Sequence, residues 1–165
     1  MAGRAFAAIV LFLAGGFGAP AGAQQLVRWG EAGGWDVMVD PTLGNGCLIQ
    51  AEYEDGSLVR IGFDRLADSA YVTAFNEGWH NVRDGSRFSV RFALDDELYD
   101  GVGKGIYLEG TPGVDIYFDN PDFLLDLAQR QTMTLYDEVG EVMSIDLEGS
   151  YVGIEAALEC QEQQG

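Results

Sequence analysis

The stretch Cys47–Asp64, CLIQAEYEDGSLVRIGFD, decides the fold class. It holds two runs of β-prone residues, Cys47–Glu54 and Ser57–Asp64, joined through the dipeptide Asp55-Gly56. That dipeptide readily supplies the positive φ angles that a tight hairpin turn needs. The sequence therefore predicts an antiparallel β-hairpin at this point of the chain.

Further strands are predicted on both sides of the hairpin. Trp35–Asp40 and Ser86–Leu94 alternate apolar with polar residues, which is typical of a half-buried strand. The other expected strands are Tyr71–Asn76, Gly105–Glu109, Val114–Phe118, Thr132–Tyr136 and Glu141–Leu147. Most of these strands are short and consecutive, so we expect a mainly β protein, an antiparallel β-sandwich or barrel.

Two segments break the β pattern and predict short helices. The first lies near residues 120–130, where Pro121 suits the first helical position. The second is C-terminal, near residues 150–161, and Ser150 is its expected N-cap, because a serine hydroxyl accepts a backbone N–H there.

The first 23 residues have the order of features found in a cleavable export signal. Arg4 precedes an uncharged apolar run, Ala5–Ala14, and Ala21–Ala23 offers the small residues that a signal peptidase accepts. The apolar run is about half of the roughly 20 residues that a membrane-spanning helix needs. We therefore expect cleavage before Gln24, a periplasmic or secreted location, and no membrane span in the mature chain.

After the signal peptide, residues 1–23, the sequence predicts a glycine-rich lead-in at residues 24–34 and a single β-rich domain at residues 35–165. Both cysteines, Cys47 and Cys160, lie in that domain. Exported proteins fold where disulfides form and persist, so we expect these two residues to be bonded. Two buried free thiols are the alternative.

The chain is strongly acidic. It has nine basic and 27 acidic residues, a net charge of −18, and loss of Arg4 with the signal makes the charge −19. Phosphate binding relies on clustered lysine and arginine, but Lys104 is the only lysine and the arginines are scattered. The composition therefore argues against nucleic acid as a partner. It favours plain solubility, or attraction of a basic protein or a cation.

Motifs for catalysis are few. His80 is the only histidine, so any Ser-His-Asp or Cys-His mechanism has to use it. No Gly-x-Ser-x-Gly motif is present, and Gly101, Gly103 and Gly105 lack the spacing of a dinucleotide-binding loop. We therefore name no catalytic residue and no cofactor.

Two segments are candidates for a binding site. Trp79, His80 and Arg83 share one predicted loop and are candidates for ligand binding, although a loop histidine beside a core tryptophan is the simpler interpretation. The densest acidic cluster consists of Asp95, Asp96, Glu97 and Asp100. These carboxylates are candidates for a calcium site or a catalytic pair, with a solvated acidic loop as the alternative.

A combination of single residues spread over the chain is similar to the pattern of a known protein family. The set is Trp35, Gly46, Cys47, Asp55, Gly56, Trp79, Phe123–Leu127, Met133, Leu147, Gly149, Ser150 and Cys160. In this combination the chain resembles small exported proteins of alphaproteobacteria that are similar to the invasion-associated locus B family. The resemblance implies a periplasmic β-rich domain, and it carries over no catalytic residue.

These observations favour a non-catalytic binding protein of the cell envelope, whose partner is a basic protein or a small ligand. A carboxylate-dependent hydrolase or a calcium-binding protein is the alternative from a different class. An inhibitor of a basic exported enzyme is a further alternative, since the negative charge fits such a partner.

Overall fold

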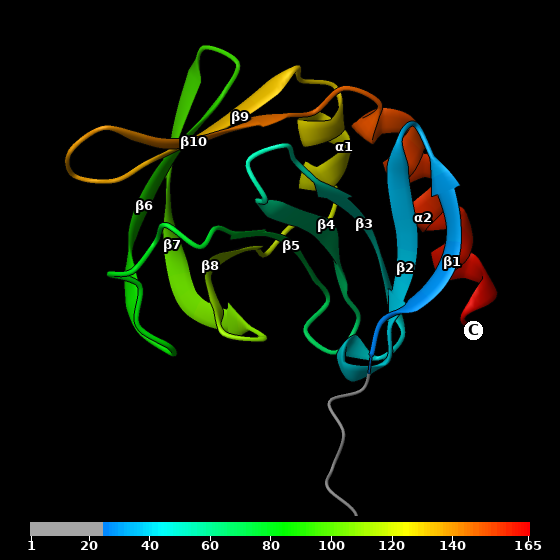
Figure 1. Ribbon diagram of the computed structural model, residues 1–165. Helices are drawn as coiled ribbons and strands as arrows, with labels where there is room; N and C mark the ends of the chain where they lie inside the picture. The colour runs from blue at the N-terminus through cyan, green and yellow to red at the C-terminus, as the bar shows by residue number, and fades with distance from the viewer. Residues whose placement is uncertain (1–24) are drawn as a thin grey trace, which may run out of the picture.

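The structure is a computed structural model that describes residues 25–165. The predicted export signal and its cleavage site lie outside the described residues. Ten antiparallel strands form one curled sheet, in the order β1-β2-β3-β4-β5-β8-β7-β6-β9-β10 (Figure 1). Because β1 and β10 are its two edges, the sheet is not closed into a barrel. The predicted mainly β, antiparallel class with two helices is confirmed.

The elements have the following bounds. The first five strands are β1 (Val27–Ala32), β2 (Trp35–Asp40), β3 (Gly46–Glu52), β4 (Leu58–Asp64) and β5 (Ser69–Phe75). The other five are β6 (Arg87–Leu94), β7 (Glu97–Leu108), β8 (Thr111–Phe118), β9 (Thr132–Tyr136) and β10 (Glu141–Asp146). The helices are a 3₁₀ turn η1 (Pro41–Leu43), α1 (Phe123–Ala128) and α2 (Ser150–Gln163).

One row of apolar side chains crosses the middle of the sheet. The strand register pairs Val37 with Ile49, Ile49 with Ile61, Ile61 with Val72, and Val72 with Ile116. All five side chains are at most 1% exposed. Branched side chains of this kind pack well on a pleated surface. The row belongs to the same core as the buried residues of the helices and of the β9–β10 hairpin.

All seven residues of β5 are buried, so both faces of the sheet are covered at its centre. On the face opposite the apolar row, the Thr73 hydroxyl donates a 2.8 Å hydrogen bond to the Asp115 carboxylate. The guanidinium of Arg60 lies 5.7 Å from the centre of the Phe75 ring on this face. Burial raises the pKa of Asp115, because it disfavours the charged carboxylate. On this second face, polar and aromatic side chains of neighbouring strands therefore cover β5.

The predicted hairpin of Cys47–Asp64 is confirmed as β3 and β4. Strands β3 and β4 pair from Leu48 opposite Gly62 to Glu52 opposite Leu58. At the turn, the Asp55 carboxylate accepts hydrogen bonds from the backbone N–H of Ser57 at 2.9 Å and from its hydroxyl at 2.8 Å. Asp55 and Gly56 thus fix the turn as their residue types indicate.

The sequence predicted an irregular lead-in at residues 24–34, and this is wrong for most of the segment. Val27–Ala32 forms the edge strand β1, which pairs with β2 across a turn at Gly33 and Gly34. Both glycines have positive φ, as such a turn requires. An edge strand has only one neighbour, and the burial of β1 does not alternate along the strand. The period-2 pattern that identifies a strand is therefore absent from its sequence.

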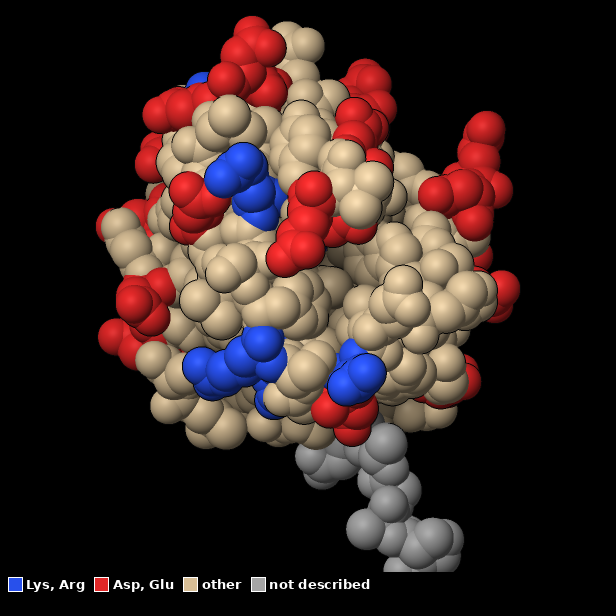
Figure 2. All heavy atoms as spheres, turned by 90° about the vertical axis from the view of Figure 1, so that its left-hand side faces the viewer, with Lys and Arg blue, Asp and Glu red and all other residues tan. Residues whose placement is uncertain are grey.

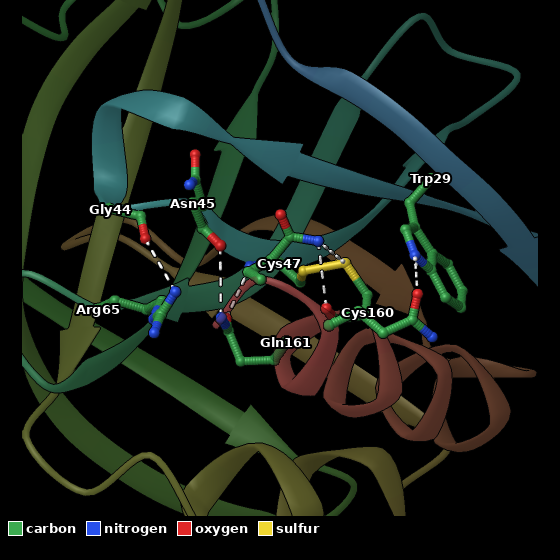
Figure 3. Close-up of a disulfide and its surroundings, with 9 residues drawn as sticks. Trp29, Gly44, Asn45, Cys47, Arg65, Cys160 and Gln161 are labelled. Carbon is green, nitrogen blue, oxygen red and sulfur yellow. Dashed lines mark hydrogen bonds between the residues drawn. A yellow bond between two sulfur atoms is a disulfide. The ribbon is translucent and has the colours of Figure 1, made fainter.

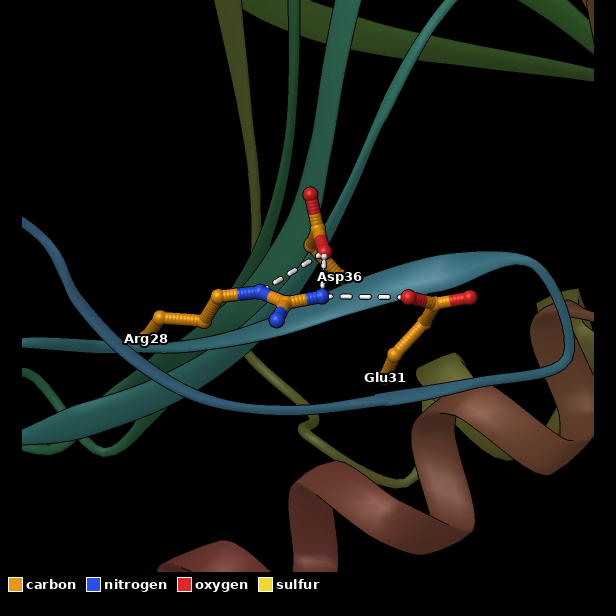
Figure 4. A network of polar contacts seen from close by, with 3 residues as sticks. All are labelled: Arg28, Glu31 and Asp36. Carbon is orange, nitrogen blue, oxygen red and sulfur yellow. Dashed lines mark hydrogen bonds and ion pairs between the residues drawn. The ribbon is translucent and has the colours of Figure 1, made fainter.

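An ion network holds the β1 edge. The guanidinium of Arg28 contacts the carboxylate of Asp36 on β2 at 2.7 Å and that of Glu31 on β1 at 3.0 Å (Figure 4). All three side chains are exposed, so the network contributes little to stability. Charged side chains on an edge strand instead discourage a second sheet from pairing there.

The acidic stretch after β6 lies in a β-hairpin, and its four carboxylates are all exposed. Strands β6 and β7 join through a tight turn at Asp95-Asp96, and β7 begins at Glu97, much earlier than the predicted start at Gly105. Glycines lower the propensity for a strand, which is why the prediction was too short. The packing requires one of them, because a Cβ at Gly103 would collide with the side chain of Val90.

Both predicted helices are present. Helix α1 is shorter than the predicted 120–130, and its residues Leu124 and Leu127 are fully buried. Helix α2 begins at the predicted position and extends two residues beyond 161. Among residues 25–165, no helix is long and apolar enough to cross a membrane.

The predicted N-cap of α2 is wrong. Gly149, with a φ of +75°, is the N-cap, and Ser150 is the first residue of the helix. The Ser150 hydroxyl is buried and has no hydrogen-bond partner among the described residues. Gly149 lies against the carbonyl oxygen of Gly33 in the β1–β2 turn, and a side chain at the cap would collide with that oxygen. The close contact between turn and helix therefore selects glycine at the cap.

The predicted disulfide is confirmed, and it fastens α2 to the sheet. Cys47 on β3 is bonded to Cys160 on α2 across 113 residues, and both are fully buried (Figure 3). Next to it, the Gln161 side chain accepts the Cys47 backbone N–H at 2.9 Å and donates to the Asn45 carbonyl oxygen at 3.3 Å. The covalent bond and these hydrogen bonds hold the end of α2 on the start of β3.

We predict that the double substitution Cys47→Ala and Cys160→Ala lowers the free energy of unfolding by about 4 to 5 kcal/mol, because it removes the cross-link that restricts the unfolded chain. Urea unfolding of the oxidised wild type and the double variant measures the difference. Wild type treated with a reductant is the control and should approach the variant. A loss below about 1 kcal/mol would show that the helix docks without the bond.

We also predict that Gly149→Ala destabilises the protein by about 3 kcal/mol, since the added Cβ meets the Gly33 carbonyl and the residue has a left-handed φ. Gly110→Ala is the matched control. Gly110 also has a positive φ, but a Cβ there meets no atom within 4 Å, so a loss of only about 1 kcal/mol is expected. Equal losses in the two variants would mean that the turn and the helix cap are not in close contact.

Candidate functional site

A cavity of about 350 Å³ opens where β9 separates from β6. The two strands pair only where Arg91–Leu94 of β6 meets Met133–Tyr136 of β9. Beyond Tyr136 the chain turns into β10, so the first half of β6, Arg87–Val90, has no strand beside it on that side. The cavity occupies the wedge between the diverging strands.

The lining of the cavity is apolar inside and polar at its rim. The apolar residues are Trp79, Val82, Phe88, Val90, Val114, Leu135 and Val142. The polar residues are His80, Asn81, Ser86, Ser89, Tyr136 and Asp137, and Gly78 completes the lining. Val90 and Leu135 also belong to the buried core, so the cavity is a cleft that reaches the core from the surface.

Short hydrogen bonds hold the loop that forms one wall. The Asn76 side chain accepts the Gly78 backbone N–H at 2.7 Å and donates to the Ser57 hydroxyl at 2.8 Å. Farther along, the Tyr107 hydroxyl donates to the Val82 carbonyl oxygen at 2.9 Å. These bonds tie both ends of the loop to the sheet and fix Trp79 at the wall of the cavity.

The structure places two of the three predicted binding residues at this cavity. Trp79 is half-buried and packs against the core, and His80 is exposed at the rim. Arg83 does not line the cavity, and its carbonyl oxygen accepts the Ser86 hydroxyl at 2.6 Å. No hydrogen bond joins the His80 imidazole to another residue within 25–165, so the geometry of a nucleophile-histidine pair is not found there.

The predicted acidic cluster serves the β6–β7 turn and its neighbours. The Asp95 carboxylate accepts the backbone N–H groups of Gln131 at 2.9 Å and Thr132 at 3.0 Å. These bonds lower the pKa of Asp95 by stabilising its charged form. Glu97 pairs with Arg130 and Asp100 with Arg91, each at 3.1 Å, while Asp96 is exposed. In the described part of the chain, no three His, Cys, Asp or Glu side chains gather closely enough to hold a metal ion.

A second cavity of about 350 Å³ lies between the β4–β5 turn and the two helices. Asp64, Asp68 and Asp122 line it together with Leu125 and Leu158. The Asp64 carboxylate accepts the backbone N–H groups of the turn that follows it, at 2.9 Å and 3.1 Å. Its negative charge is therefore used in the turn, and Phe63 is the one aromatic residue that lines this cavity, compared with Trp79, Phe88 and Tyr136 in the first.

The face that carries β6 and the β9–β10 turn differs from the rest of the surface. In Figure 2, the middle of this face is hollowed and mostly uncharged; acidic and basic side chains both lie close to the hollow, and further acidic side chains lie toward the outer edge. Of the eight basic residues after the predicted signal, four belong to β6, β7 and the loop before them: Arg83, Arg87, Arg91 and Lys104. Half of the basic residues of this part of the acidic chain therefore belong to the β6–β7 hairpin and the loop before it.

The comparisons with known proteins do not identify the chain: no family model, no curated protein and no solved structure matches it.

Most of the cavity wall was not predicted as a site. Phe88 and Val90 were expected to face the core because of their alternation, which is where the structure places them. Val114, Leu135 and Val142 gave no signal beyond apolar strand residues. The cavity arises from where β9 parts from β6, and no local pattern encodes that point.

Asp95 allows a pH test of its structural role. A carboxylate whose pKa is lowered by folding stabilises the folded state above its unfolded pKa, near 4, and loses this effect as the pH falls through the lowered value. We predict that Asp95→Ala lowers the melting temperature at pH 6 and that the difference from wild type shrinks toward pH 2. Asp96→Ala, a change at the neighbouring turn residue, should have little effect at either pH. A calcium-induced rise in the wild-type melting temperature that Asp95→Ala abolishes would contradict the structural role.

Proposed function

We propose that the protein is a non-catalytic binding protein of the cell envelope that takes a small apolar or aromatic group in the cavity between β6 and β9. The observation that carries this proposal is an open cavity of about 350 Å³ whose inner wall is Trp79, Phe88, Val90, Val114 and Leu135. Ligand sites are commonly clefts of roughly this size, mostly apolar, with a few polar groups at the rim.

The side chains at the rim support binding rather than catalysis. The His80 imidazole forms no hydrogen bond within residues 25–165. It therefore has neither a nucleophile to activate nor a carboxylate to orient it in that part of the chain. The Asp137 carboxylate accepts the backbone N–H groups of Val139 at 2.7 Å and Gly140 at 2.9 Å, so it belongs to the β9–β10 turn. A second carboxylate does not line this cavity, and a glycosidase mechanism needs two.

Location in the envelope is part of the proposal. The export signal read from residues 1–23 supports it, as does the resemblance to exported proteins similar to the invasion-associated locus B family. A buried disulfide between distant residues is compatible with folding in an oxidising compartment.

We predict that indole, used as a probe, binds in the cavity and shifts the NMR signal of the Trp79 indole N–H. Val142→Trp should weaken this binding at least about tenfold, because the larger side chain fills the cavity that Val142 lines. Val139→Trp is the matched control: Val139 is 95% exposed on the same hairpin and does not line the cavity, so binding should persist. If indole fails to bind the wild type, or if both variants bind it equally, the proposed function is wrong.

A further inference from the structure

The first half of β6 presents an unpaired strand edge inside the cavity. Two backbone hydrogen bonds fix which residues face which neighbour: the Gly105 N–H donates to the Ser86 oxygen at 2.8 Å, and the Asp95 N–H donates to the Thr132 oxygen at 3.0 Å. In an antiparallel strand, alternate residues bond to opposite neighbours. Even-numbered residues of β6 therefore bond to β7, and odd-numbered residues face the side of β9.

This parity leaves four backbone groups open. Arg91 is opposite Tyr136, the last residue of β9, so Arg87 and Ser89 lie beyond the end of that strand. Their N–H and C=O groups point to the side where the chain supplies no strand, and no hydrogen bond joins these groups to a described side chain. Ser86, Phe88, Ser89 and Val90 all line the cavity, so there is space beside this edge.

The same half of β6 has apolar side chains on one face and a basic side chain on the other. Phe88 and Val90 point to the core side, toward the apolar wall. Arg87 points to the other face, directly opposite Lys104 on β7, and both are exposed. Like charges directly opposite each other in a sheet are unfavourable. Neither side chain forms an ion pair with a described residue, but Lys104 also lies opposite Asp115 on β8, whereas Arg87 has no strand beside it on its other side. An added carboxylate on that side would offset the charge of Arg87.

We propose that this edge binds an extended peptide segment of a partner protein, which adds to β6 in line with β9. One apolar side chain of the segment enters the cavity beside Trp79, and an acidic residue next to it lies over Arg87 and Lys104. Successive residues of a strand point to opposite faces, so neighbouring acidic and apolar residues meet both requirements. Strand addition of this kind takes affinity from backbone hydrogen bonds and specificity from alternate side-chain pockets. The inference rests on the proposed function, because it uses the same cavity.

A second copy of this chain fits the edge less well than such a peptide. If two β6 edges paired around Ser89, residues Arg87 and Arg91 of one copy would lie opposite the same two arginines of the other. Four guanidinium groups would then share one small area with repulsion between them. The charge at the edge thus selects an acidic segment.

The experiment uses two peptides and two proline variants of the full mature chain. The probe is the blocked hexapeptide Thr-Glu-Phe-Glu-Val-Thr, and the comparison is Thr-Lys-Phe-Lys-Val-Thr. Ser89→Pro removes the open N–H of the β6 edge. Ser144→Pro is the matched control, because the contact of the Leu147 N–H with the Gln131 oxygen places the even residues of β10 on its free side. Both prolines replace an exposed serine whose N–H lacks a strand partner.

Calorimetry should show that the acidic peptide binds the wild type and Ser144→Pro alike, and that Ser89→Pro binds it at least about tenfold more weakly. The lysine peptide, and Arg87→Glu with the acidic peptide, should each lose about the same factor. The melting temperature of Ser89→Pro should stay close to that of Ser144→Pro, which shows that the variant folds without using the cavity as the readout. As a second measurement on the unaltered protein, methylation of the peptide nitrogen that faces Ser89 should also abolish binding.

The outcomes separate this inference from the proposed function. Absence of indole binding to the wild type removes both. Indole binding together with equal peptide affinity for wild type and Ser89→Pro overturns strand addition at β6 and leaves the cavity as a small-molecule site. A loss confined to Ser144→Pro assigns the peptide to the β10 edge and also overturns the inference. Equal affinity for the acidic and lysine peptides contradicts the part assigned to Arg87 and Lys104.

Discussion

The row of branched side chains across β2, β3, β4, β5 and β8 is the constraint on which the rest of the structure depends. Strand register is strict where one face is buried, since a slip of one residue would turn the whole apolar set to the wrong face. Fixing this row also fixes where Cys47 lies on β3, and hence where α2 can attach. The helix in turn covers the row at Ile49, against which Gly153 of α2 packs closely. The disulfide secures an arrangement that the register has already set.

The candidate site follows from the limits of that same sheet. Strand β6 is eight residues long and pairs with β7 along its whole length, but β9 is only five residues long and starts from the far end. The difference in length leaves a stretch of β6 without its second neighbour. Open N–H and C=O groups are tolerated only where water or a partner can reach them. A cavity beside them is therefore a physical requirement as well as an opportunity for binding.

Much of the fold could be predicted from local signals, and the site could not. Alternation and the Asp55-Gly56 turn identified most strands, and the predicted export signal together with two cysteines led to the correct disulfide. The edge strand β1 was missed because one-sided pairing removes the alternation, and β7 was shortened because its glycines lower strand propensity while meeting a packing need.

Trp79 and His80 were singled out for their residue types, and they do line the cavity. The wall of the cavity between β6 and β9 depends on the pairing of Arg91 with Tyr136, two residues distant in sequence. The acidic cluster misled because composition alone cannot distinguish a ligand set from carboxylates that accept backbone N–H groups, as Asp95 does.

The two kinds of strand edge in this sheet are treated differently, and the contrast bears on function. Edge β1 carries the Arg28 network and a register shift between Arg28 and Gly30, features that hinder pairing with another sheet. The open half of β6 carries no charge on the side facing the cavity, and its one basic side chain, Arg87, points to the opposite face and forms no ion pair with a described residue. In a chain with three acidic residues for each basic one, carboxylates to pair with Arg87 are abundant. None of the described carboxylates pairs with Arg87, so its charge stays available, while the surrounding acidic surface repels acidic partners at long range. An acidic segment binds at this edge only if its short-range contact with Arg87 outweighs the long-range repulsion. The site would therefore discriminate between segments by fit as well as by charge.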